Sequence, residues 1–196
     1  LKNRYKIDFT EYKTSTISRR IERRIMLSNS LDLGSYCELL RGDPQELDSL
    51  YKALLPGVTG FFRARHAFAH LREEVVPQLL ARLEPHQELR AWVVGAATGE
   101  EAFSLAIVLQ EAIEQAHWPG TIKIFATDVH PESLDCASHG VFSEEAIAEV
   151  SEERRARFFV KGPDGFQISP ELRRAVVFVS HNVIKDAPFT NLDLIT

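Results

Sequence analysis

One segment of the sequence has the residue types of a nucleotide-binding turn. Residues 93–101 read Val-Val-Gly-Ala-Ala-Thr-Gly-Glu-Glu, so an apolar run turns at Gly95 into a helical pattern that starts at Glu100. A glycine lets a ligand approach the backbone closely, and a helix N-terminus offers unpaired N–H groups. The segment has only two glycines and no phosphate-loop lysine, so it matches neither dinucleotide fingerprint nor P-loop. A plain strand-to-helix turn is the alternative interpretation.

A carboxylate follows the next apolar run. Asp128 stands at the C-terminal end of the predicted strand at 122–126, where an acid can accept hydrogen bonds from both hydroxyls of a ribose. It lies 33 positions after Gly95, compared with about 20 in the dinucleotide fingerprint, which disfavours a nicotinamide cofactor. The alternative is that Asp128 caps the helix that begins near Pro131.

Two further polar residues lie beside predicted elements. Arg63 follows Phe61 and Phe62, where it could hold a carboxylate bidentately or simply be exposed beside packed aromatic rings. Asn182 comes just after the predicted strand at 175–179, where it could bind an adenine edge or cap a turn.

Signals of other chemistry are absent from the sequence. His66 and His70 are four residues apart, but no zincin glutamate lies between them, so no metal site is predicted. There is no nucleophile elbow, and Cys37 and Cys136 have no basic neighbour that would activate them. No catalytic residue is therefore assigned.

The apolar pattern of the C-terminal part predicts an α/β fold. Strands are expected at 89–94, 122–126, 175–179 and 192–196, and helices at 100–116 and 131–138. This alternation is typical of a doubly wound parallel sheet. A turn at residues 162–165 predicts a small hairpin insertion.

The N-terminal part reads as short helices. Ile17, Ile21 and Ile25 form one apolar stripe. A second helix is expected from Ser35, with Glu38 completing a capping box, and a third from Asp43 as N-cap to a stop at 56–57. A fourth helix is expected over 66–83, with a kink or a restart at Pro77.

Charge is distributed unevenly along the chain. The net charge is −5, but residues 1–26 carry +5, so the remainder carries −10. Such a basic segment favours an acidic partner, with a solvated helix face as the alternative. The candidate partner-binding residues are four arginines of the predicted helix: Arg19, Arg20, Arg23 and Arg24.

Compartment and alternative partners are predicted from the rest of the composition. The acidic remainder argues against nucleic acid as the partner. No membrane-length apolar run and no signal peptide are present, and the unpaired cysteines fit a reduced, cytoplasmic protein.

Six ordered motifs make the sequence similar to the CheR-type chemotaxis receptor methyltransferases. They are ISRRIERRI (17–25), GVTGFFR (57–63), GAATGEEAFSLA (95–106), IFATDVHPESLDCA (124–137), HNVIKDAPF (181–189) and LDLIT (192–196). The resemblance covers essentially the whole chain and is closest to members fused to methylesterase and other signalling domains. Members of the family transfer a methyl group from S-adenosylmethionine to glutamate side chains of chemoreceptors and release S-adenosylhomocysteine.

The resemblance implies a fold and its boundaries. It implies a small all-helical N-terminal domain at 1–65, a linker helix region at 66–87, and a Rossmann-like methyltransferase domain at 88–196 with an antiparallel β insertion at about 158–180. Because the family continues past the last motif with a Cys-Arg-Asn segment, we expect the chain to be truncated and to bind cofactor poorly. Gly57 also stands where chemotaxis members often have Asn.

The resemblance also implies a role for particular residues. It implies that Thr59 and Arg63 lie at the amino-acid end of the cofactor. Gly95 and Glu100 would belong to the first cofactor-binding loop of the protein. Asp128 would take the ribose hydroxyls, and Asn182 with the backbone of Val183 would lie near the adenine. The arginine-rich helix would face the acidic methylation region of a chemoreceptor or a similar acidic helical protein.

The implied reaction needs alignment rather than proton transfer. A glutamate side chain has a reference pKa of about 4.3, so it is already an ionised nucleophile at neutral pH. The alternative to the enzyme is a non-catalytic signalling module of the same fold that binds cofactor or partner without turnover.

Overall fold

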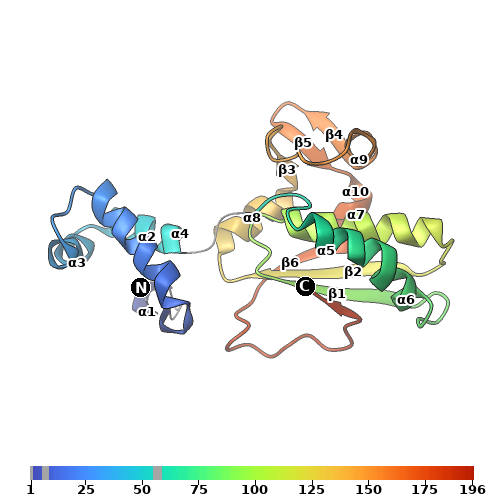
Figure 1. The fold of residues 1–196 in the computed structure, drawn as a ribbon, viewed down its shortest axis with the longest axis horizontal. Helices are drawn as coiled ribbons and strands as arrows, with labels where there is room; N and C mark the ends of the chain where they lie inside the picture. The colour runs from blue at the N-terminus through green and yellow to red at the C-terminus, as the bar shows by residue number, and fades with distance from the viewer. Residues whose placement is uncertain (1, 6–8, 55–58) are drawn as a thin grey trace. The chain divides into compact units, whose positions relative to one another are not determined.

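Backbone contacts divide the chain into two units, Leu1–Val58 and Thr59–Thr196 (Figure 1). The computed structural model describes residues 2–5, 9–54 and 59–196. The helices between residues 65 and 80 belong to the second unit, whereas the sequence-based division ends the first domain at 65 and treats 66–87 as a linker. The expected helix stop at 56–57, and Gly57 with it, lie outside the described residues.

The first unit is all-helical in its described part. Its elements are α1 (Lys2–Tyr5), η1 (Phe9–Glu11), α2 (Thr14–Leu27), α3 (Leu33–Gly42) and α4 (Pro44–Leu54). The apolar stripe of α2 packs against a buried cluster of Tyr36, Leu50 and Leu54, as its four-residue spacing predicts.

The helix starts of this unit test the capping predictions. Asp43 accepts hydrogen bonds from the N–H groups of Gln45 (2.8 Å) and Glu46 (3.1 Å), so the predicted N-cap of α4 is confirmed. The predicted cap of α3 is wrong. Asp32 accepts from the N–H of Ser35 (2.8 Å) and donates its own N–H to the Ser35 hydroxyl (3.1 Å), so Ser35 is the third residue of the helix rather than its cap.

A four-stranded parallel sheet forms the second unit, in the order β6-β2-β1-β7. Its strands are β1 (Glu88–Val94), β2 (Thr121–Asp128), β6 (Val176–Ser180) and β7 (Leu194–Ile195). In register, Trp92 of β1 pairs with Phe125 of β2 on one side and with Ile195 of β7 on the other. The predicted α/β class with a Rossmann-like parallel sheet is confirmed.

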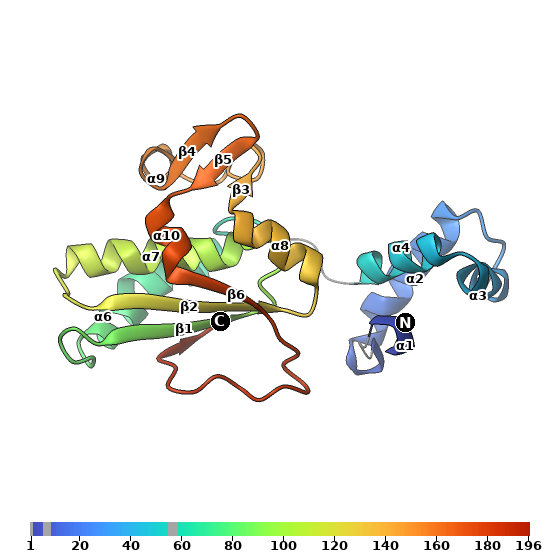
Figure 2. The same cartoon turned by 180° about the vertical axis from the view of Figure 1, so that it is seen from behind.

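Helices cover one face of this sheet. They are α7 (Glu100–Gln115), α8 (Pro131–His139) and α10 (Pro170–Ala175). Residues 102–109 of α7 are all buried, because the helix lies between the sheet and other helices. Residues 181–193 pass beneath the opposite face, between β6 and β7 (Figure 2).

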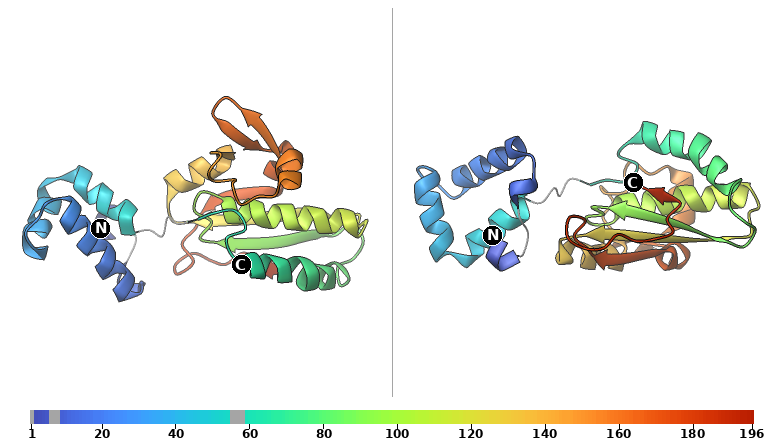
Figure 3. Two further views of the ribbon diagram at one scale, coloured as in Figure 1. Left: turned by 45° about the horizontal axis from the view of Figure 1, so that its top comes forward. Right: turned by 90° about the horizontal axis from the view of Figure 1, so that it is seen from below.

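The helix expected over 66–83, with a kink or a restart at Pro77, is three consecutive segments. They are α5 (Arg65–His70), a π-helical turn η2 (Leu71–Val75) and α6 (Val76–Leu80), which run beside α7 (Figure 3). Pro77 lies in the first turn of α6, where its missing N–H costs little, so the chain restarts its α-helix there.

The insertion is a three-stranded antiparallel sheet in the order β3-β5-β4. Its strands are β3 (Val141–Phe142), β4 (Phe159–Gly162) and β5 (Gly165–Ile168), with α9 (Glu152–Phe158) beside them. The insertion therefore begins and ends earlier than the expected 158–180, because residues 176–180 pair with β2 in the large sheet. Its first strand has two residues, too few to show a sequence period.

Candidate functional site

The turn after β1 is tied to the end of β2. The N–H groups of Gly95 and Ala96 both donate to the carbonyl of Thr127, at 2.8 and 2.9 Å. Gly95 has a φ of +76°, a conformation that L side chains rarely adopt. These bonds bring the turn against the carboxyl end of β2, which is where open parallel sheets bind ligands.

The second glycine of the turn is required for packing. Gly99 precedes α7 with a φ of +96°. A Cβ at this position would lie 3.0 Å from the Cβ of Ala137 and 3.2 Å from the ring of Phe178. Gly99 therefore lets the start of α7 approach α8 and β6.

Asp128 joins two loops through its carboxylate. Oδ2 accepts the N–H of Ala97 at 2.9 Å, and Oδ1 accepts the N–H of His130 at 2.9 Å. The N-cap of α8 is His130, so Asp128 is not the helix cap that was the alternative interpretation. Each carboxylate oxygen keeps a further lone pair, and the side chain is half-buried, so two ribose hydroxyls can still be accepted.

Glu100 is buried at the first turn of α7. The residue is 7 % exposed, and its Oε2 accepts a hydrogen bond from the hydroxyl of Thr98 at 2.6 Å. A buried carboxylate costs free energy unless it is hydrogen-bonded or lies near positive charge. The α7 N-terminus meets that need in part, because its free N–H groups favour anions.

The segment that carries Thr59 and Arg63 is anchored to the same helix. The N–H of Phe62 donates to the hydroxyl of Ser104 at 3.0 Å, and that hydroxyl donates to the carbonyl of Glu100 at 2.7 Å. Thr59 is half-buried and Arg63 is exposed. Phe61 and Phe62 are both buried, so packing accounts for these two rings.

Asn182 follows β6 and caps a turn. Its Oδ1 accepts the N–H of Ile184 at 3.0 Å, and its own N–H donates to Asp186 at 2.7 Å. The preceding residue, His181, donates its N–H to the carbonyl of Asp128 at 3.0 Å, so the loop starts beside that carboxylate. The side chain of Val183 is exposed. The turn-cap alternative is thus correct for Oδ1, while the amide Nδ2 makes no hydrogen bond within the described part of the chain.

Comparisons with known proteins agree with this geometry. Residues 57–196 match the family model described as the CheR methyltransferase SAM-binding domain, and residues 1–55 match that of its all-alpha domain. The chain belongs to the CheR methyltransferase family. S-adenosylmethionine (SAM) is therefore the cofactor of the domain that the second unit represents, and the resemblance inferred from the sequence is confirmed.

The relatives differ in length and in name. A 104.1 kDa protein of Rhodobacter capsulatus is 44 % identical over 191 residues, which are 97 % of this chain and 20 % of that protein. A chemotaxis protein methyltransferase of Listeria innocua is 31 % identical, over 96 % of this chain and 70 % of the relative. Chemotaxis protein methyltransferase 2 of Pseudomonas aeruginosa is 36 % identical, over 91 % of this chain and 63 % of the relative. The chain thus spans between 20 % and 70 % of the length of these proteins.

The CheR-type cofactor fits the donors at this edge. A nucleoside needs acceptors for its ribose hydroxyls and donors or acceptors for its base. The carboxylate of Asp128 is an acceptor at this edge, and the Asn182 amide and the Val183 backbone stand at the start of the neighbouring loop. The structure therefore brings Gly95, Asp128 and Asn182 to the hydrogen-bonded ends of β1, β2 and β6. Glu100 begins α7, and Arg63 follows Phe62, whose N–H donates to Ser104 of that helix.

An aromatic cluster beneath the sheet holds the loop of residues 181–193, and sequence reasoning did not find it. Phe189 stacks on Phe125 at 4.7 Å between centroids and meets Trp92 edge-on at 5.2 Å. The ring of His181 lies 5.3 Å from that of Trp92, and its Nε2 contacts the carbonyl of Ala187 at 3.0 Å. The cluster joins two strands to a loop, so no local spacing reveals it. It fixes the loop that carries Asn182 from the far side of the sheet.

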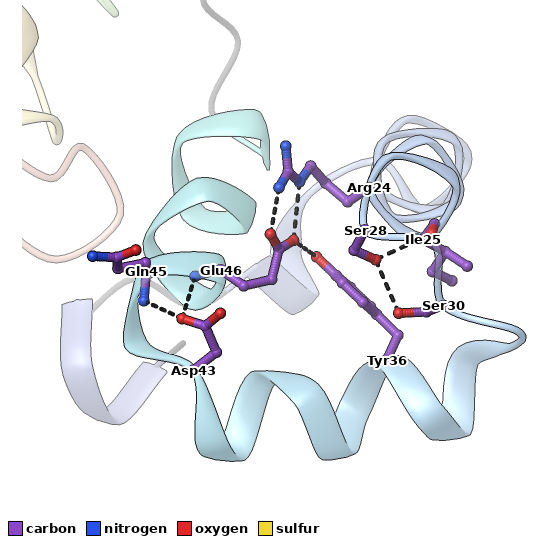
Figure 4. Close-up of polar contacts among 8 residues, drawn as sticks. All are labelled: Arg24, Ile25, Ser28, Ser30, Tyr36, Asp43, Gln45 and Glu46. Carbon is purple, nitrogen blue, oxygen red and sulfur yellow. Dashed lines mark hydrogen bonds and ion pairs between the residues drawn. The ribbon is translucent and has the colours of Figure 1, made fainter.

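The four basic residues of α2 have different surroundings. Arg24 binds Glu46 through two hydrogen bonds of 3.1 and 2.5 Å, and the hydroxyl of Tyr36 donates to the same carboxylate at 2.7 Å (Figure 4). Arg20 donates to the carbonyl of Ala53 at 2.9 Å. Arg19 and Arg23, in contrast, are exposed and make no hydrogen bond or ion pair with other described residues.

The Arg24–Glu46–Tyr36 network shifts the ionisation of its members. Burial alone would raise the pKa of Glu46, but hydrogen bonds from Arg24 and Tyr36 outweigh it and lower that pKa. Burial, together with the hydrogen bond to Glu46, raises the pKa of Tyr36 to about 12. Arg24 therefore joins α2 to α3 and α4, although the sequence places it among the residues for a partner.

A cavity of about 1140 Å³ lies elsewhere in the second unit. It runs along α6 and the C-terminal half of α7, with Leu80, Trp118 and Arg154 among its lining residues, and includes none of the predicted cofactor residues. Arg154 is already bound by Glu111 at 2.8 and 2.7 Å. The guanidinium of Arg154 is thus paired within the unit.

Among the described residues, no helix is both long enough and apolar enough to cross a membrane.

Proposed function

We propose that this protein is a protein-glutamate O-methyltransferase that transfers a methyl group from SAM to glutamate side chains of a chemoreceptor. Membership of the CheR family and the names of the relatives support methyl transfer in chemotaxis. The observation that carries the proposal is the carboxylate of Asp128, placed where the ends of β1, β2 and β6 are joined by hydrogen bonds.

The residues would divide the cofactor between them. Asp128 would take the ribose hydroxyls, Asn182 and the backbone of Val183 the adenine, and Gly95 with Glu100 would form the first loop. Thr59 and Arg63 would lie at the amino-acid end, where a guanidinium can hold a carboxylate bidentately. The residue Arg63 is exposed to solvent.

The chemistry requires positioning by the protein. SAM supplies a methyl group on a positively charged sulfur, which is electrophilic without further activation. The acceptor glutamate is ionised at neutral pH and needs no general base. The protein's own contribution is to align the two groups and to exclude water, and such alignment can lower a barrier by several kcal/mol.

Calorimetric titration of S-adenosylhomocysteine tests the cofactor assignment. It should be carried out on this chain and on a version extended past Thr196. We expect micromolar binding by the extended version and at least tenfold weaker binding after Asp128→Ala, because a hydrogen bond to a charged group contributes about 1.5–3 kcal/mol. Asp135→Ala is the matched control, since Asp135 is an exposed acid on α8.

Two results separate the cofactor site from the reaction. Unchanged affinity in Asp128→Ala, with an unchanged thermal melt, would contradict the assignment of the ribose site. Methyl transfer is then measured with radiolabelled SAM and the cytoplasmic domain of a chemoreceptor. Binding of cofactor without methyl transfer would favour the alternative hypothesis, a non-catalytic signalling module of the same fold.

A further inference from the structure

The backbone of Phe62 has a conformation that large side chains rarely adopt. Its φ is +50°, in the left-handed region, where a Cβ crowds the backbone and raises the free energy. Among the described residues other than glycine that have a positive φ, Phe62 is the only buried one. A residue strained in this way persists only where its surroundings hold it, and such residues gather at functional sites. The next residue is Arg63, proposed for the amino-acid end of the cofactor.

Two contacts hold Phe62 in this conformation. Its N–H donates to the buried hydroxyl of Ser104 at 3.0 Å, and the guanidinium carbon of Arg154 lies 4.5 Å from the centroid of its ring, a cation–π distance. The angle φ is the rotation about the bond between N and Cα. Because Ser104 fixes the N–H on one side of that bond and Arg154 fixes the ring on the other, the two contacts together determine φ.

Arg154 is itself held in place by a carboxylate. Its Nε and Nη2 donate to the two carboxylate oxygens of Glu111 at 2.8 and 2.7 Å, and the two side chains are only 19 % and 25 % exposed. A two-pronged pair of this kind fixes the plane of a guanidinium as well as its position. Glu111 lies on α7 and Arg154 on α9, so the antiparallel insertion reaches Phe62 through an arginine that the long helix orients.

We propose that Ser104 and Arg154 are positioning residues for the cofactor. They hold Phe62 in its left-handed conformation, and this conformation directs the chain so that Arg63 meets the carboxylate of the cofactor's amino-acid group. A return of Phe62 to an ordinary φ near −60° would rotate the chain by roughly 110° about one bond and carry Arg63 away. The inference rests on the proposed function for the identity of the ligand and adds how its amino-acid end is held.

Calorimetric titration with two ligands tests the proposal. S-adenosylhomocysteine carries the amino-acid group, whereas 5′-methylthioadenosine has the same nucleoside and sulfur with a methyl group in its place. The ratio of their dissociation constants therefore reports the amino-acid end alone, while a general loss of structure weakens both ligands. The variants are Ser104→Ala, Arg154→Met and the double variant that combines them. They are made in this chain and in the version extended past Thr196.

Arg157→Met is the matched control. Arg157 also lies on α9 and pairs with a glutamate of α7, Glu114, but its guanidinium carbon lies 4.5 Å from the ring centroid of Phe158 instead of Phe62. The control therefore removes an arginine–glutamate pair between the same two helices and leaves the contact with Phe62 in place. Backbone NMR shifts of Phe62 and Arg63, recorded without ligand, report the conformation of the segment directly.

We expect the unmodified protein to bind S-adenosylhomocysteine at least about tenfold more tightly than 5′-methylthioadenosine, because a guanidinium holds a carboxylate through charge-assisted hydrogen bonds. The double variant should reduce this ratio to about threefold or less and leave the affinity for 5′-methylthioadenosine unchanged. The single variants should lie between, and Arg157→Met should keep the ratio of the unmodified protein. The shifts of Phe62 and Arg63 should change in the double variant and not in Arg157→Met.

Three outcomes would overturn the proposal. An unchanged ratio in the double variant would show that the two contacts do not act on the cofactor. An equal loss of affinity for both ligands would make Ser104 and Arg154 residues of general stability. Unchanged shifts of Phe62 and Arg63 would show that other contacts hold the left-handed conformation. If the unmodified protein binds neither ligand, the proposed function fails, while the shifts still decide whether Ser104 and Arg154 hold Phe62.

Discussion

Single carboxylates hold together segments that are distant in the sequence. Asp128 joins the turn after β1 to the start of α8, and Glu46 joins α2 to α3 through Arg24 and Tyr36. In both cases an acidic side chain accepts at least two hydrogen bonds, so its removal leaves several donors without a partner. Such residues cost more to replace than their own contacts suggest.

Glu46→Gln is predicted to destabilise the first unit at neutral pH. The Arg24 side chain is only 20 % exposed and would lose its charged partner, so we expect a loss of about 2 kcal/mol in the free energy of unfolding. Because the pKa of Glu46 is lowered in the folded state, its stabilisation is present above the ordinary glutamate pKa and is lost as pH falls through the folded value. Urea unfolding at pH 7 and below 4 measures both effects.

The control for this prediction is Glu38→Gln, because Glu38 is an exposed acid on α3. It should leave both the stability at pH 7 and its acid dependence unchanged. If Glu46→Gln retained the full acid dependence of the unmodified protein, another carboxylate would be responsible. A separate rise in pH from 10 to about 12 should weaken the folded state through Tyr36, whose pKa is raised.

The contacts of a residue were predictable only where its hydrogen-bonding partner lies close in the sequence or where a known motif places the residue. The cap at Asp43 follows from its position before Pro44, and the position of Asp128 at the end of β2 follows from the apolar run before it. The partner of Arg24 lies 22 positions away on another helix, so its spacing on α2 could not show that it is already bound. The link that Ser104 makes between Phe62 and Glu100 was not predictable either, because a single serine inside an apolar helix forms no sequence pattern.

At the scale of elements, the periodicity of apolar residues and the positions of turn and cap residues predicted the main helices and strands. The strands at 88–94, 121–128 and 176–180 and the long helix α7 lie where buried apolar runs and a 3.6-residue period place them. The start of α3 was misplaced because Asp32 and Ser35 can each begin a capping box. The position of the loop of residues 181–193 could not be predicted from the sequence, because ring contacts between distant residues rather than local periodicity hold it.

Phe189→Ala is predicted to loosen that loop selectively. Its ring stacks on Phe125 and contacts Trp92, while the loop ends are bound to Asp128 at His181 and to Arg90 at Asp193. Loss of the central anchor should raise hydrogen exchange in residues 182–192 about tenfold or more, while α7 stays protected. Hydrogen-exchange mass spectrometry measures it.

Two further variants sharpen this prediction. Phe189→Tyr keeps the ring and should exchange like the unmodified protein, and Ile184→Ala removes an exposed side chain of the same loop and should also have little effect. Equal protection of the loop in Phe189→Ala would show that the backbone hydrogen bonds at its two ends suffice.

At the scale of the whole molecule, the two units have separate hydrophobic clusters. Tyr36, Leu50 and Leu54 form one, and residues around α7 and the large sheet form the other. The change from helical to strand periods predicted the α/β part of the chain. Where the units divide depends on contacts of the helices at 65–80, which sequence periodicity does not record.

The separate clusters predict two unfolding transitions with different optical probes. All four tyrosines lie in the first unit and both tryptophans in the second, so tyrosine absorbance and tryptophan fluorescence report the units independently. Leu50→Ala should lower only the tyrosine transition and Leu105→Ala only the tryptophan transition, each by about 2–5 kcal/mol, because each truncates a buried side chain. Urea titrations with both probes measure this. Coincident transitions that shift together in both variants would show instead that the units unfold as one cooperative body.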